Sequence, residues 1–371
     1  MEKIIKKLFL TIPFIIIFII LSSLKLRLSK KCFKNGEIRI FCWGQYISDG
    51  SDGSLNILKT FEKEENINIA AFNTFDSAEQ MYAKLKNGNC NYDVVFSSDY
   101  MIKRLIDENL IQKIDMHKLK NYENIETNFK GSVLGYDKYD EYSVPYSWGH
   151  MAITYNSKLI KSLTGIDAEK IVTGWEALFN PRLNQEVLMF INSRDSFSIA
   201  QKLLGNSLNT QNKKHILNAS NVLKKQRKIV QAYVMDEMFD KMEGGSALIS
   251  PAYSGDIISM MNNNKDLKYC FPKQGSNIFV DAVCIPKNAK NKDNALKFID
   301  FLCRGDIALE NAMFINYSTP NKKAYEMLPI ELKNNKIAYP PEEIIKRCEA
   351  HMPLTKENTA LIETLWANIR N

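Results

Sequence analysis

An aspartate inside an apolar segment is the first residue whose chemistry needs an account. Gly275 to Pro286 reads GSNIFVDAVCIP, and its apolar and small residues follow one another as in a β-strand, except at Asp281. Burying a carboxylate is costly unless something positive meets it. One interpretation is therefore that Asp281 faces a cleft and binds a cationic ligand. The alternative is an ordinary acid at a strand end that caps a helix or pairs with a nearby lysine.

Other residues that could bind a ligand follow further predicted strands. Strands are predicted at 38–43, 67–72, 92–98, 187–191, 247–249 and 278–286. Helical segments alternate with the first of them, which predicts a parallel sheet covered on both faces, and such sheets bind ligands at the carboxyl ends of their strands. The candidate residues at these ends, or in the turns beyond them, are Trp43, Tyr46, Ser98, Asp99, Tyr100, Asp195, Tyr253, Phe279, Asp281 and Tyr317.

Aromatic and acidic side chains dominate this set, and all of its charged members are acids. Ring faces attract ammonium groups by about 0.5–2 kcal/mol each and also cover methylene groups. Carboxylates form charge-assisted hydrogen bonds, which are the strong ones, with the charged ends of such a ligand. The set thus favours a flexible organic cation. The competing interpretation is that half of these aromatic residues, Phe279 and Tyr317 included, are ordinary core residues.

The elements that must position these residues form two units. Ser143 to Ile153 (SVPYSWGHMAI) is typical of a hinge, because Pro145 and Gly149 bracket aromatic residues between two apolar stretches. A second α/β unit follows, the strand at 278–286 returns to the first unit, and a helix is predicted over 287–306. No internal repeat or Gly/Ser linker separates the units. Two lobes with crossings near residues 149 and 281 fit this order.

Composition and charge exclude one class of partner. The chain has 371 residues, of which 45% are hydrophobic and 25% charged, so a folded chain with a large core is expected. Its formal net charge is +7, but residues 1–36 contain eight Lys/Arg and a single acid and so carry all of it. The remainder is neutral overall, and the argument for a nucleic-acid partner fails.

The N-terminal residues 1–36 predict a signal peptide or signal anchor. Leu8 to Leu24 is an almost unbroken apolar run that follows Lys3, Lys6 and Lys7. No small-x-small cleavage site follows it, so we expect an uncleaved anchor with the remaining chain outside the cytoplasmic membrane. Five basic residues follow the run and only three precede it, which opposes this orientation, although long domains are translocated despite such charges.

The sequence contains no pattern of a metal site, a cofactor or an enzyme. Its seven cysteines are scattered without a CxxC pair, and its four histidines have no metal-ligand spacing. An odd number of cysteines in an exported protein leaves at least one free thiol or an intermolecular bond. GxSxG, HExxH, P-loop and dinucleotide motifs are absent. We therefore expect neither catalysis nor a cofactor nor a bound metal.

Several blocks of the sequence together resemble one family. FCWGQYI, MYAKLKNG, YDVVFSSDY, VPYSWG, VDAVCIPKNAKNKDNALKFIDFL and NYSTPN are similar to the bacterial spermidine/putrescine-binding proteins of polyamine ABC transporters, from about Ile38 to Pro341. The resemblance implies an α/β, two-lobe periplasmic-binding fold of type II that closes on a linear polyamine between its lobes. The expected division is 37–149 and 280–325 for lobe 1, and 150–279 and 326–371 for lobe 2.

The resemblance also implies roles for individual residues. Trp43 and Tyr46, Ser98 and Tyr100, Asp281 and Tyr317 fall on the ligand contacts of that family. Asp195 stands where the family has Glu, Tyr253 and Phe279 each replace a Trp, and His351 lies near another contact. Asn192 stands where spermidine binders have an acid, so one amine partner is lost or becomes a neutral hydrogen bond. These differences affect the choice of polyamine more than the polyamine class.

The predicted function is an anchored extracytoplasmic polyamine receptor, expected to be a monomer, that closes its lobes on the ligand and delivers it to a permease. Alternatives are a binding protein for another cargo (an amino acid, thiamine or iron) and a polyamine sensor that transports nothing. Anionic cargo would need cationic residues or helix N-termini, and Arg194 is the one candidate. A glycosidase using Asp195 and Asp281 would need turnover of an oligosaccharide, and no motif supports it.

Overall fold

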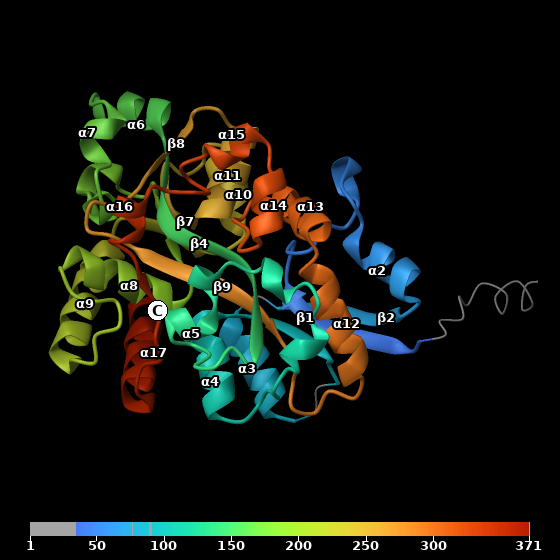
Figure 1. The fold of residues 1–371 in the computed structure, drawn as a ribbon. Helices are drawn as coiled ribbons and strands as arrows, with labels where there is room; N and C mark the ends of the chain where they lie inside the picture. The colour runs from blue at the N-terminus through green and yellow to red at the C-terminus, as the bar shows by residue number, and fades with distance from the viewer. Residues whose placement is uncertain (1–34, 76, 89–90, 371) are drawn as a thin grey trace, which may run out of the picture.

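The computed structural model describes residues 35–75, 77–88 and 91–370. Its strands form one mixed sheet that twists through the molecule (Figure 1). The strands are β1 Glu37–Trp43, β2 Asn68–Phe75, β3 Val94–Ser98, β4 Ser143–Asn156, β5 Val187–Phe190, β6 Val230–Val234, β7 Ile249–Tyr253, β8 Leu267–Cys270, β9 Asn277–Cys284 and β10 Glu349–Ala350.

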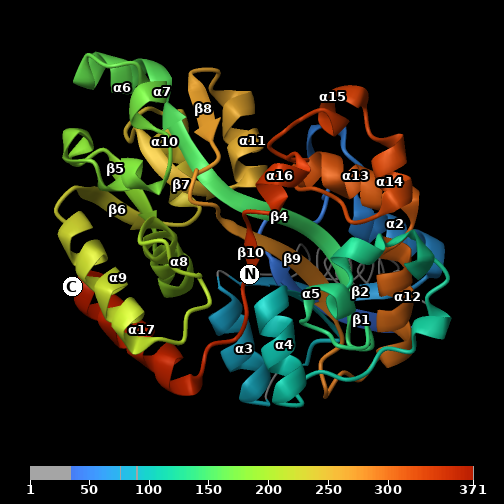
Figure 2. The same ribbon diagram turned by 60° about the vertical axis from the view of Figure 1, so that its left-hand side comes forward.

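Helices lie on both faces of this sheet (Figures 1 and 2). They are α2 Ile57–Glu65, α3 Ala78–Lys86, α4 Asp99–Asp107, α5 Gly131–Leu134, α6 Ser157–Thr164, α7 Ala168–Ile171, α8 Ser193–Leu203, α9 Lys213–Gln226, α10 Glu237–Glu243, α11 Ser254–Asn263, α12 Lys292–Leu302, α13 Gly305–Ile315, α14 Lys322–Met327, α15 Ile330–Lys333, α16 Glu342–Ile345 and α17 Lys356–Arg370.

Pairing within the sheet is mixed, so the prediction of a parallel sheet was only partly correct. The strand order is β2-β1-β3-β9-β4-β7-β5-β6, with β10 beside β9 and β8 beside β4. The three N-terminal strands are parallel, as are β5 and β6. Both long central strands, β4 and β9, pair with their neighbours β3 and β7 in the antiparallel sense. β9 comes much later in the chain than β3 and β4. The alternation of strands and helices alone does not predict that it pairs with them.

The long strand β4 joins the two halves of the sheet without a break. Residues 143–150 pair with β9, and residues 151–156 pair with β7 and β8. The predicted hinge at 143–153 is therefore a continuous strand with a register shift between Pro145 and Ser147. Gly149 leaves room for the Phe279 ring of β9, because a Cβ atom at this position would lie 2.8 Å from that ring. β4 and β9 run side by side through the middle of the molecule (Figure 2).

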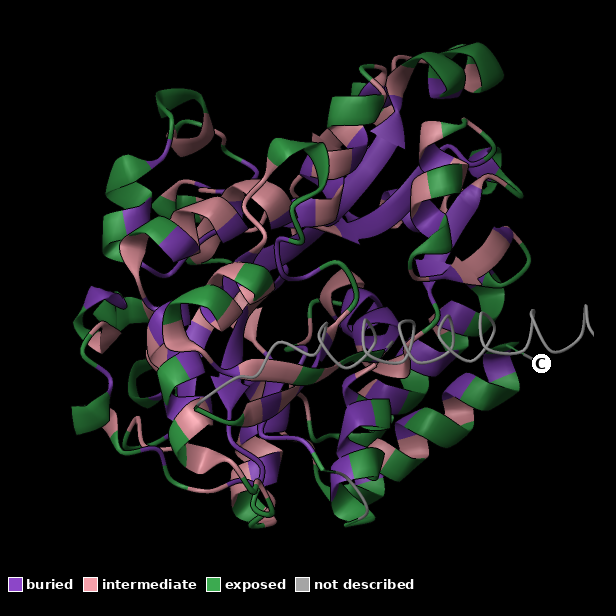
Figure 3. Ribbon diagram, turned by 90° about the vertical axis from the view of Figure 1, so that its right-hand side faces the viewer, coloured by how far each residue is buried: buried purple, intermediate pink, exposed green. Residues whose placement is uncertain are grey.

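Apolar residues fill both faces of each half, as the sequence predicted. In β1, Ile40 packs with α2 and α12, whereas the next residue, Phe41, packs with α3 and α4. In β4, Ile153 and Ala152 likewise belong to cores on opposite faces. Figure 3 shows the strands as mostly buried and the outer faces of the helices as exposed. A sheet covered on both faces leaves its strand ends as the places where polar side chains gather.

Two predicted elements were wrong in their bounds. The strand predicted at 247–249 is β7, Ile249–Tyr253, and it contains Pro251. Proline has no N–H group to donate to a neighbouring strand. β7 pairs with β5 only at Ile249, so Pro251 lies beyond the part of β7 that β5 contacts. The single helix predicted over 287–306 is two helices, α12 and α13, because Arg304 between them is extended.

The C-terminal segment passes back across the molecule, from α16 through β10 to α17 (Figure 2). Its strand β10 pairs with Asn277 and Ile278 of β9, and α17 then packs on α8 and α9. Glu349 forms an ion pair with Lys202 of α8. In the part of the chain that the structure describes, no helix is long and apolar enough to cross a membrane. The predicted signal peptide or anchor at 1–36 lies almost wholly outside the described residues.

Candidate functional site

Four aromatic residues form a continuous row across the two halves of the sheet. Tyr46 follows β1, Tyr317 follows α13, Phe279 is in β9, and Tyr253 ends β7. Neighbouring ring centroids in that order are 5.7, 6.1 and 5.5 Å apart. Edge-to-face contacts of this kind are favourable by about 0.5–1.5 kcal/mol beyond area burial. The structure thus brings together four of the predicted site residues that lie far apart in the sequence.

Asp281 lies at one end of this row in a nearly closed environment. Its side chain is 6% exposed, and the Tyr46 hydroxyl donates to its Oδ2 at 2.6 Å. The Ser147 hydroxyl lies beside that of Tyr46. Among the described residues, the second oxygen, Oδ1, is buried and receives no well-formed hydrogen bond. A buried carboxylate oxygen without a donor is costly, so this position favours an external cationic donor.

Asp195 lies at the other end of the row. It is 8% exposed, and its Oδ2 accepts hydrogen bonds from Tyr253 and from the Asn192 side-chain amide. Asn192 is also the N-cap of α8, since its Oδ1 accepts from the Asp195 backbone N–H at 2.8 Å. The pair therefore begins the helix and orients the carboxylate. Asn192, Asp195 and Tyr253 form one group, as their predicted common role requires.

A further acid, Asp256, belongs to this region and was missed by sequence reasoning. It lies in the first turn of α11, and the Tyr317 hydroxyl donates to its Oδ1 at 2.8 Å. The signal was present, because Asp256 follows the carboxyl end of β7 by three residues. The strand was predicted to end at residue 249, four residues before its observed end at Tyr253, which placed Asp256 too far beyond it. With the observed bounds, the same strand-end rule selects it.

Ser98, Asp99 and Tyr100 occupy the junction of β3 and α4 but differ in their surroundings. Ser98 is the cross-strand partner of Asp281. Asp99 is 1% exposed, and its carboxylate accepts from the backbone N–H groups of Tyr100 and Val280. The Tyr100 hydroxyl donates to Glu79 at 3.0 Å. Ser98 and Tyr100 are half-buried, whereas Asp99 lies behind them and is closed off from solvent.

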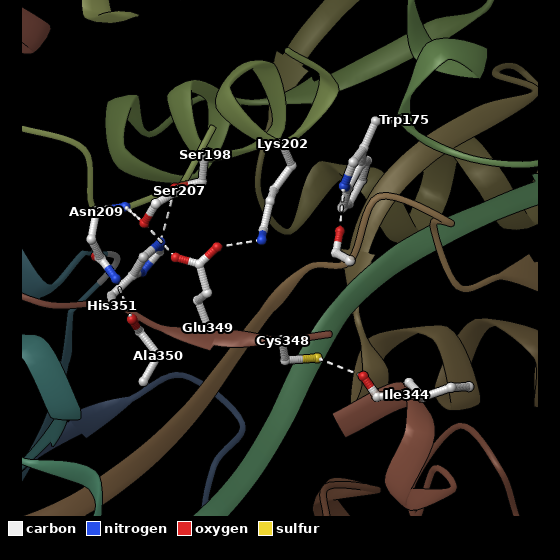
Figure 4. Close-up of polar contacts among 11 residues, drawn as sticks. Trp175, Ser198, Lys202, Ser207, Asn209, Ile344, Cys348, Glu349, Ala350 and His351 are labelled. Atoms are coloured by element: carbon white, nitrogen blue, oxygen red, sulfur yellow. Dashed lines mark hydrogen bonds and ion pairs between the residues drawn. The ribbon is translucent and has the colours of Figure 1, made fainter. Parts of the chain in front are cut away.

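Trp43 and His351 lie on the two flanks of the site. The half-buried Trp43 packs against Phe75, with ring centroids 4.4 Å apart. Its Nε1 is one of the buried groups of the described chain without a hydrogen-bond partner. The His351 ring meets Tyr100 edge to face at 5.8 Å, and its Nε2 lies 2.9 Å from the Ser198 hydroxyl of α8 (Figure 4). His351 thus joins the C-terminal segment to both sides of the site.

The site is filled by its own side chains. Tyrosine hydroxyls from Tyr46, Tyr253 and Tyr317 donate to Asp281, Asp195 and Asp256 respectively. The cavity lined by Tyr317 and Ser147 has a volume of about 20 Å³, which is room for about one water. This cavity, at the Tyr317 end of the row, is too small for a ligand larger than water. The hydroxyl groups occupy positions that ammonium groups of a ligand could take.

Burial raises the pKa of each acid in the site. The pKa of Asp281 is raised to about 6 by burial, against the opposing effects of the Tyr46 and Ser98 hydroxyl groups. Burial raises the pKa of Asp256 to about 7, although the Tyr317 hydroxyl opposes this. The pKa of Asp195 is also raised by burial. In each of these acids the leading cause is loss of water around the ionised form.

The ligand-free protein should lose stability as the pH rises from 7 to 8.5. Asp256 and Asp99, whose pKa burial raises to about 8, hold protons in this range that the unfolded chain has already lost. The folded state therefore binds more protons, and the free energy of unfolding should fall by about 1–2 kcal/mol. Denaturant titrations at the two pH values measure this. An increase in stability with pH would contradict these environments.

The donor set of the site suits an organic cation better than a metal ion. In the described ranges, no group of three or more His, Cys, Asp or Glu side chains is arranged to hold a metal. The carboxylates are instead spaced along a row of rings. No hydrogen bond from Lys or Arg reaches Asp281, Asp195 or Asp256, whose donors among the described residues are hydroxyl and amide groups. Rings and separate acids bind a ligand with methylene groups between charged ends.

The family model for bacterial extracellular solute-binding proteins matches residues 56–340. The chain belongs to this family. Curated relatives cover most of its length and are named as binding proteins, which agrees with the prediction that it is not an enzyme. The spermidine/putrescine-binding periplasmic protein of Salmonella typhimurium is 34% identical over 85% of this chain and 86% of its own length. The putrescine-binding periplasmic protein SpuD of Pseudomonas aeruginosa is 28% identical over 91% of this chain and 92% of its own.

Solved structures of other solute-binding proteins share the fold. A putative spermidine/putrescine ABC transporter protein from Listeria monocytogenes superimposes with a TM-score of 0.82 at 33% identity, covering 90% of this chain and 98% of that one. The substrate-binding protein PotD from Streptococcus pneumoniae gives a TM-score of 0.75 at 31% identity, with the same coverage. The predicted resemblance to spermidine/putrescine-binding proteins is thereby confirmed. The ligand roles of individual residues stay predictions.

Proposed function

We propose that this solute-binding protein is an extracytoplasmic receptor that binds a polyamine and delivers it to the permease of an ABC transporter. The observation that carries the proposal is the buried, unpartnered Oδ1 of Asp281 at one end of an aromatic row whose other end carries Asp195. Rings cover the methylene groups of a linear polyamine, and separate carboxylates bind its amines. The names of the relatives agree with this ligand class.

Closure of two lobes around the ligand is the proposed mechanism. We place lobe 1 at 37–149 and 280–325, and lobe 2 at 150–279 and 326–371, with the ligand between them. In support, β4 and β9 cross between the halves, and Ile337 packs into the core of the second half. Opening by a hinge motion would separate Tyr317 from Phe279 and admit the ligand. On closure, ammonium groups would displace the tyrosine hydroxyls from the carboxylates.

The proposed ligand contacts are the residues predicted from the sequence, except Asp99, which is closed off behind them, together with Asp256. Asp281 and Asp256 would bind one end of the polyamine, because Tyr46 and Tyr317, which hold these acids, are neighbours. Asp195 would bind the other end. At the position where a second acid would bind another amine, Asn192 has a neutral amide. That amide already donates a hydrogen bond to Asp195. This end therefore supplies a single negative charge.

The proposed place of action is the outer face of the cytoplasmic membrane. The relatives are named periplasmic proteins, and residues 8–24 are apolar enough to serve as a signal or an anchor. We propose that this segment retains the protein at the membrane, close to the permease. Protease treatment of intact cells and alkaline extraction of membranes test both points: an anchored protein is degraded from outside and stays with the membrane.

Isothermal titration of the purified full chain tests the function. Spermidine and putrescine are the ligands, with lysine and magnesium as controls for a carboxylate-bearing amine and a compact cation. Saturable one-to-one binding of a polyamine in moderate salt, with the controls silent, is the expected result. Binding of lysine with no response to polyamines would overturn the ligand class while leaving the family intact.

A further inference from the structure

Glu79 lies beside the site and is bonded to one of its tyrosines. It is an exposed residue in the first turn of α3, and its Oε1 accepts a hydrogen bond from the Tyr100 hydroxyl of α4 at 3.0 Å. The helix itself does not need this side chain as a cap, because Ser77 accepts from the Gln80 N–H. The helix dipole favours any acid in the first turn, but it does not account for the bond to Tyr100.

Another tyrosine–acid pair on the same two helices contains its own cations. Tyr82 of α3 donates to Glu108, the residue that follows α4, and Lys86 and Arg104 form ion pairs with the same carboxylate. Those cations balance the charge without a ligand. Among the described residues, no Lys or Arg forms an ion pair with Glu79. Its carboxylate is therefore open to a cation from outside the chain.

The bond between Tyr100 and Glu79 repeats an arrangement found throughout the site. In each case a tyrosine predicted as a ligand contact donates its hydroxyl to a carboxylate that no lysine or arginine of the described chain is bonded to. The four pairs are Tyr46 with Asp281, Tyr253 with Asp195, Tyr317 with Asp256, and Tyr100 with Glu79. The first three acids are proposed ligand contacts. Glu79 has the same arrangement at the edge of the site.

Glu79 belongs to the Asp195 end of the aromatic row, although it comes from the other half of the molecule. Burial, followed by the charges of Glu79 and Asp195, raises the pKa of the Tyr100 hydroxyl, which places both carboxylates near that group. Asp195 is in α8, and Glu79 is in α3. Acids from both sides of the proposed cleft are thus present at this end.

Arg194 makes this end of the site depend on Glu79. Its positive charge reaches Asp195 and Glu79, although its guanidinium donates hydrogen bonds elsewhere, to the Asn209 side chain and the Met352 carbonyl. The cap of α8 is a neutral amide and adds no negative charge. With Asp195 alone, the charge of Arg194 would offset the attraction for a further ammonium group. Glu79 restores a net negative charge at this end.

We propose that Glu79 is a ligand contact that binds an additional ammonium group at the Asp195 end of the row, so that the site prefers a triamine to a diamine. The inference rests on the proposed polyamine function. Of the three ammonium groups of a triamine, one would bind at Asp281 and Asp256 and a second at Asp195. The third would bind at Glu79, where it displaces the Tyr100 hydroxyl. A diamine has no third ammonium group and gains nothing from this contact.

Isothermal titration of the full chain with spermidine and putrescine at pH 7.5 tests the preference. Wild type should bind spermidine more tightly. Glu79→Gln removes the charge and keeps the size of the side chain, so spermidine affinity should fall by about five- to twentyfold, the effect of a charge-assisted contact that solvent partly screens. Putrescine affinity should stay within about twofold. If Glu79→Gln changes both affinities by the same factor, or changes neither, the inference is wrong and the polyamine function stands.

Two further comparisons separate a ligand contact from other effects. Asp107→Asn removes the same charge from an exposed pair with Lys103 on α4 and should leave both affinities unchanged. An equal loss of spermidine affinity in Asp107→Asn would assign the preference to overall charge and overturn the role of Glu79.

In a Tyr100→Phe background, Glu79→Gln should still lower spermidine affinity by a similar factor, because the carboxylate itself binds the ligand. If Glu79→Gln has no effect in that background, Glu79 acts only by holding Tyr100, and it is not a ligand contact. Failure of the wild type to bind either polyamine would overturn the proposed function together with this inference.

Discussion

Asp281→Asn should weaken polyamine binding by about 10- to 150-fold, which corresponds to a charge-assisted hydrogen bond of about 1.5–3 kcal/mol. The amide has the shape of the carboxylate but no charge, and one of its two polar atoms is a donor that would face the ligand ammonium. Because Asp281 is 6% exposed and has an unpartnered Oδ1, water cannot compensate for the loss. Isothermal titration of wild type and variant at pH 7.5 measures the difference.

The fold should survive this substitution. Burial raises the pKa of Asp281 to about 6, so the ionised carboxylate destabilises the ligand-free protein at pH 7.5, and a neutral amide relieves that cost. The melting temperature should therefore stay equal or rise. Asp293→Asn is the matched control, since Asp293 is an exposed partner of Lys118 and surface pairs contribute little. Polyamine affinity that is equal in Asp281→Asn and Asp293→Asn would show that Asp281 is not a ligand contact.

Gly255→Ala should reduce polyamine affinity by about tenfold or more through Tyr317. A Cβ atom on Gly255 would lie 2.4 Å from two carbons of the Tyr317 ring, so the ring must leave its position. The cavity beside it, about 20 Å³, is too small for a phenol ring. Displacement breaks the ring contacts to Tyr46 and Phe279 and removes the hydroxyl from Asp256. Each lost ring contact to an ammonium group is worth about 0.5–2 kcal/mol.

Gly255 is helical, so alanine should favour the helix itself and any loss comes from the steric clash. Gly44→Ala is the matched control, because Gly44 also follows a strand end at the site, has no positive φ, and has open space within 4 Å of the position that the alanine methyl group would take. Its polyamine affinity should stay within about twofold of wild type, since the added methyl group displaces nothing. If Gly255→Ala binds polyamine as well as Gly44→Ala does, Tyr317 is not part of the ligand wall.

The sequence was sufficient for the parts of the site that local rules govern. Asp281 interrupts an apolar strand, and the structure places it in β9 beside Ser98, the end of another predicted strand. Asn192 and Asp195 follow β5 closely, so the strand-end rule and the helix cap place both. Aromatic residues at strand ends were predicted to share one region, and Tyr46, Tyr317, Phe279 and Tyr253 form a continuous row.

What could not be predicted depends on long-range pairing. The antiparallel course of β4 and β9 places residues 143–150 against a strand about 130 positions later, and no local pattern encodes that partner. The bounds of β7 depend on β5 pairing only at Ile249, which makes Pro251 tolerable and moves Asp256 into the site. Asp99 matched the composition of a ligand contact, but its carboxylate turns toward backbone N–H groups.

A crystal structure of the polyamine complex tests the central claim most directly. We predict one ammonium nitrogen within about 3 Å of Asp281 Oδ1, a normal charge-assisted distance. Methylene groups should lie along the rings of Phe279 and Tyr317, and at least one tyrosine hydroxyl should be displaced from its acid. A polyamine bound elsewhere, with the Tyr46 hydroxyl still on Asp281 and Oδ1 still without a partner, would contradict the account.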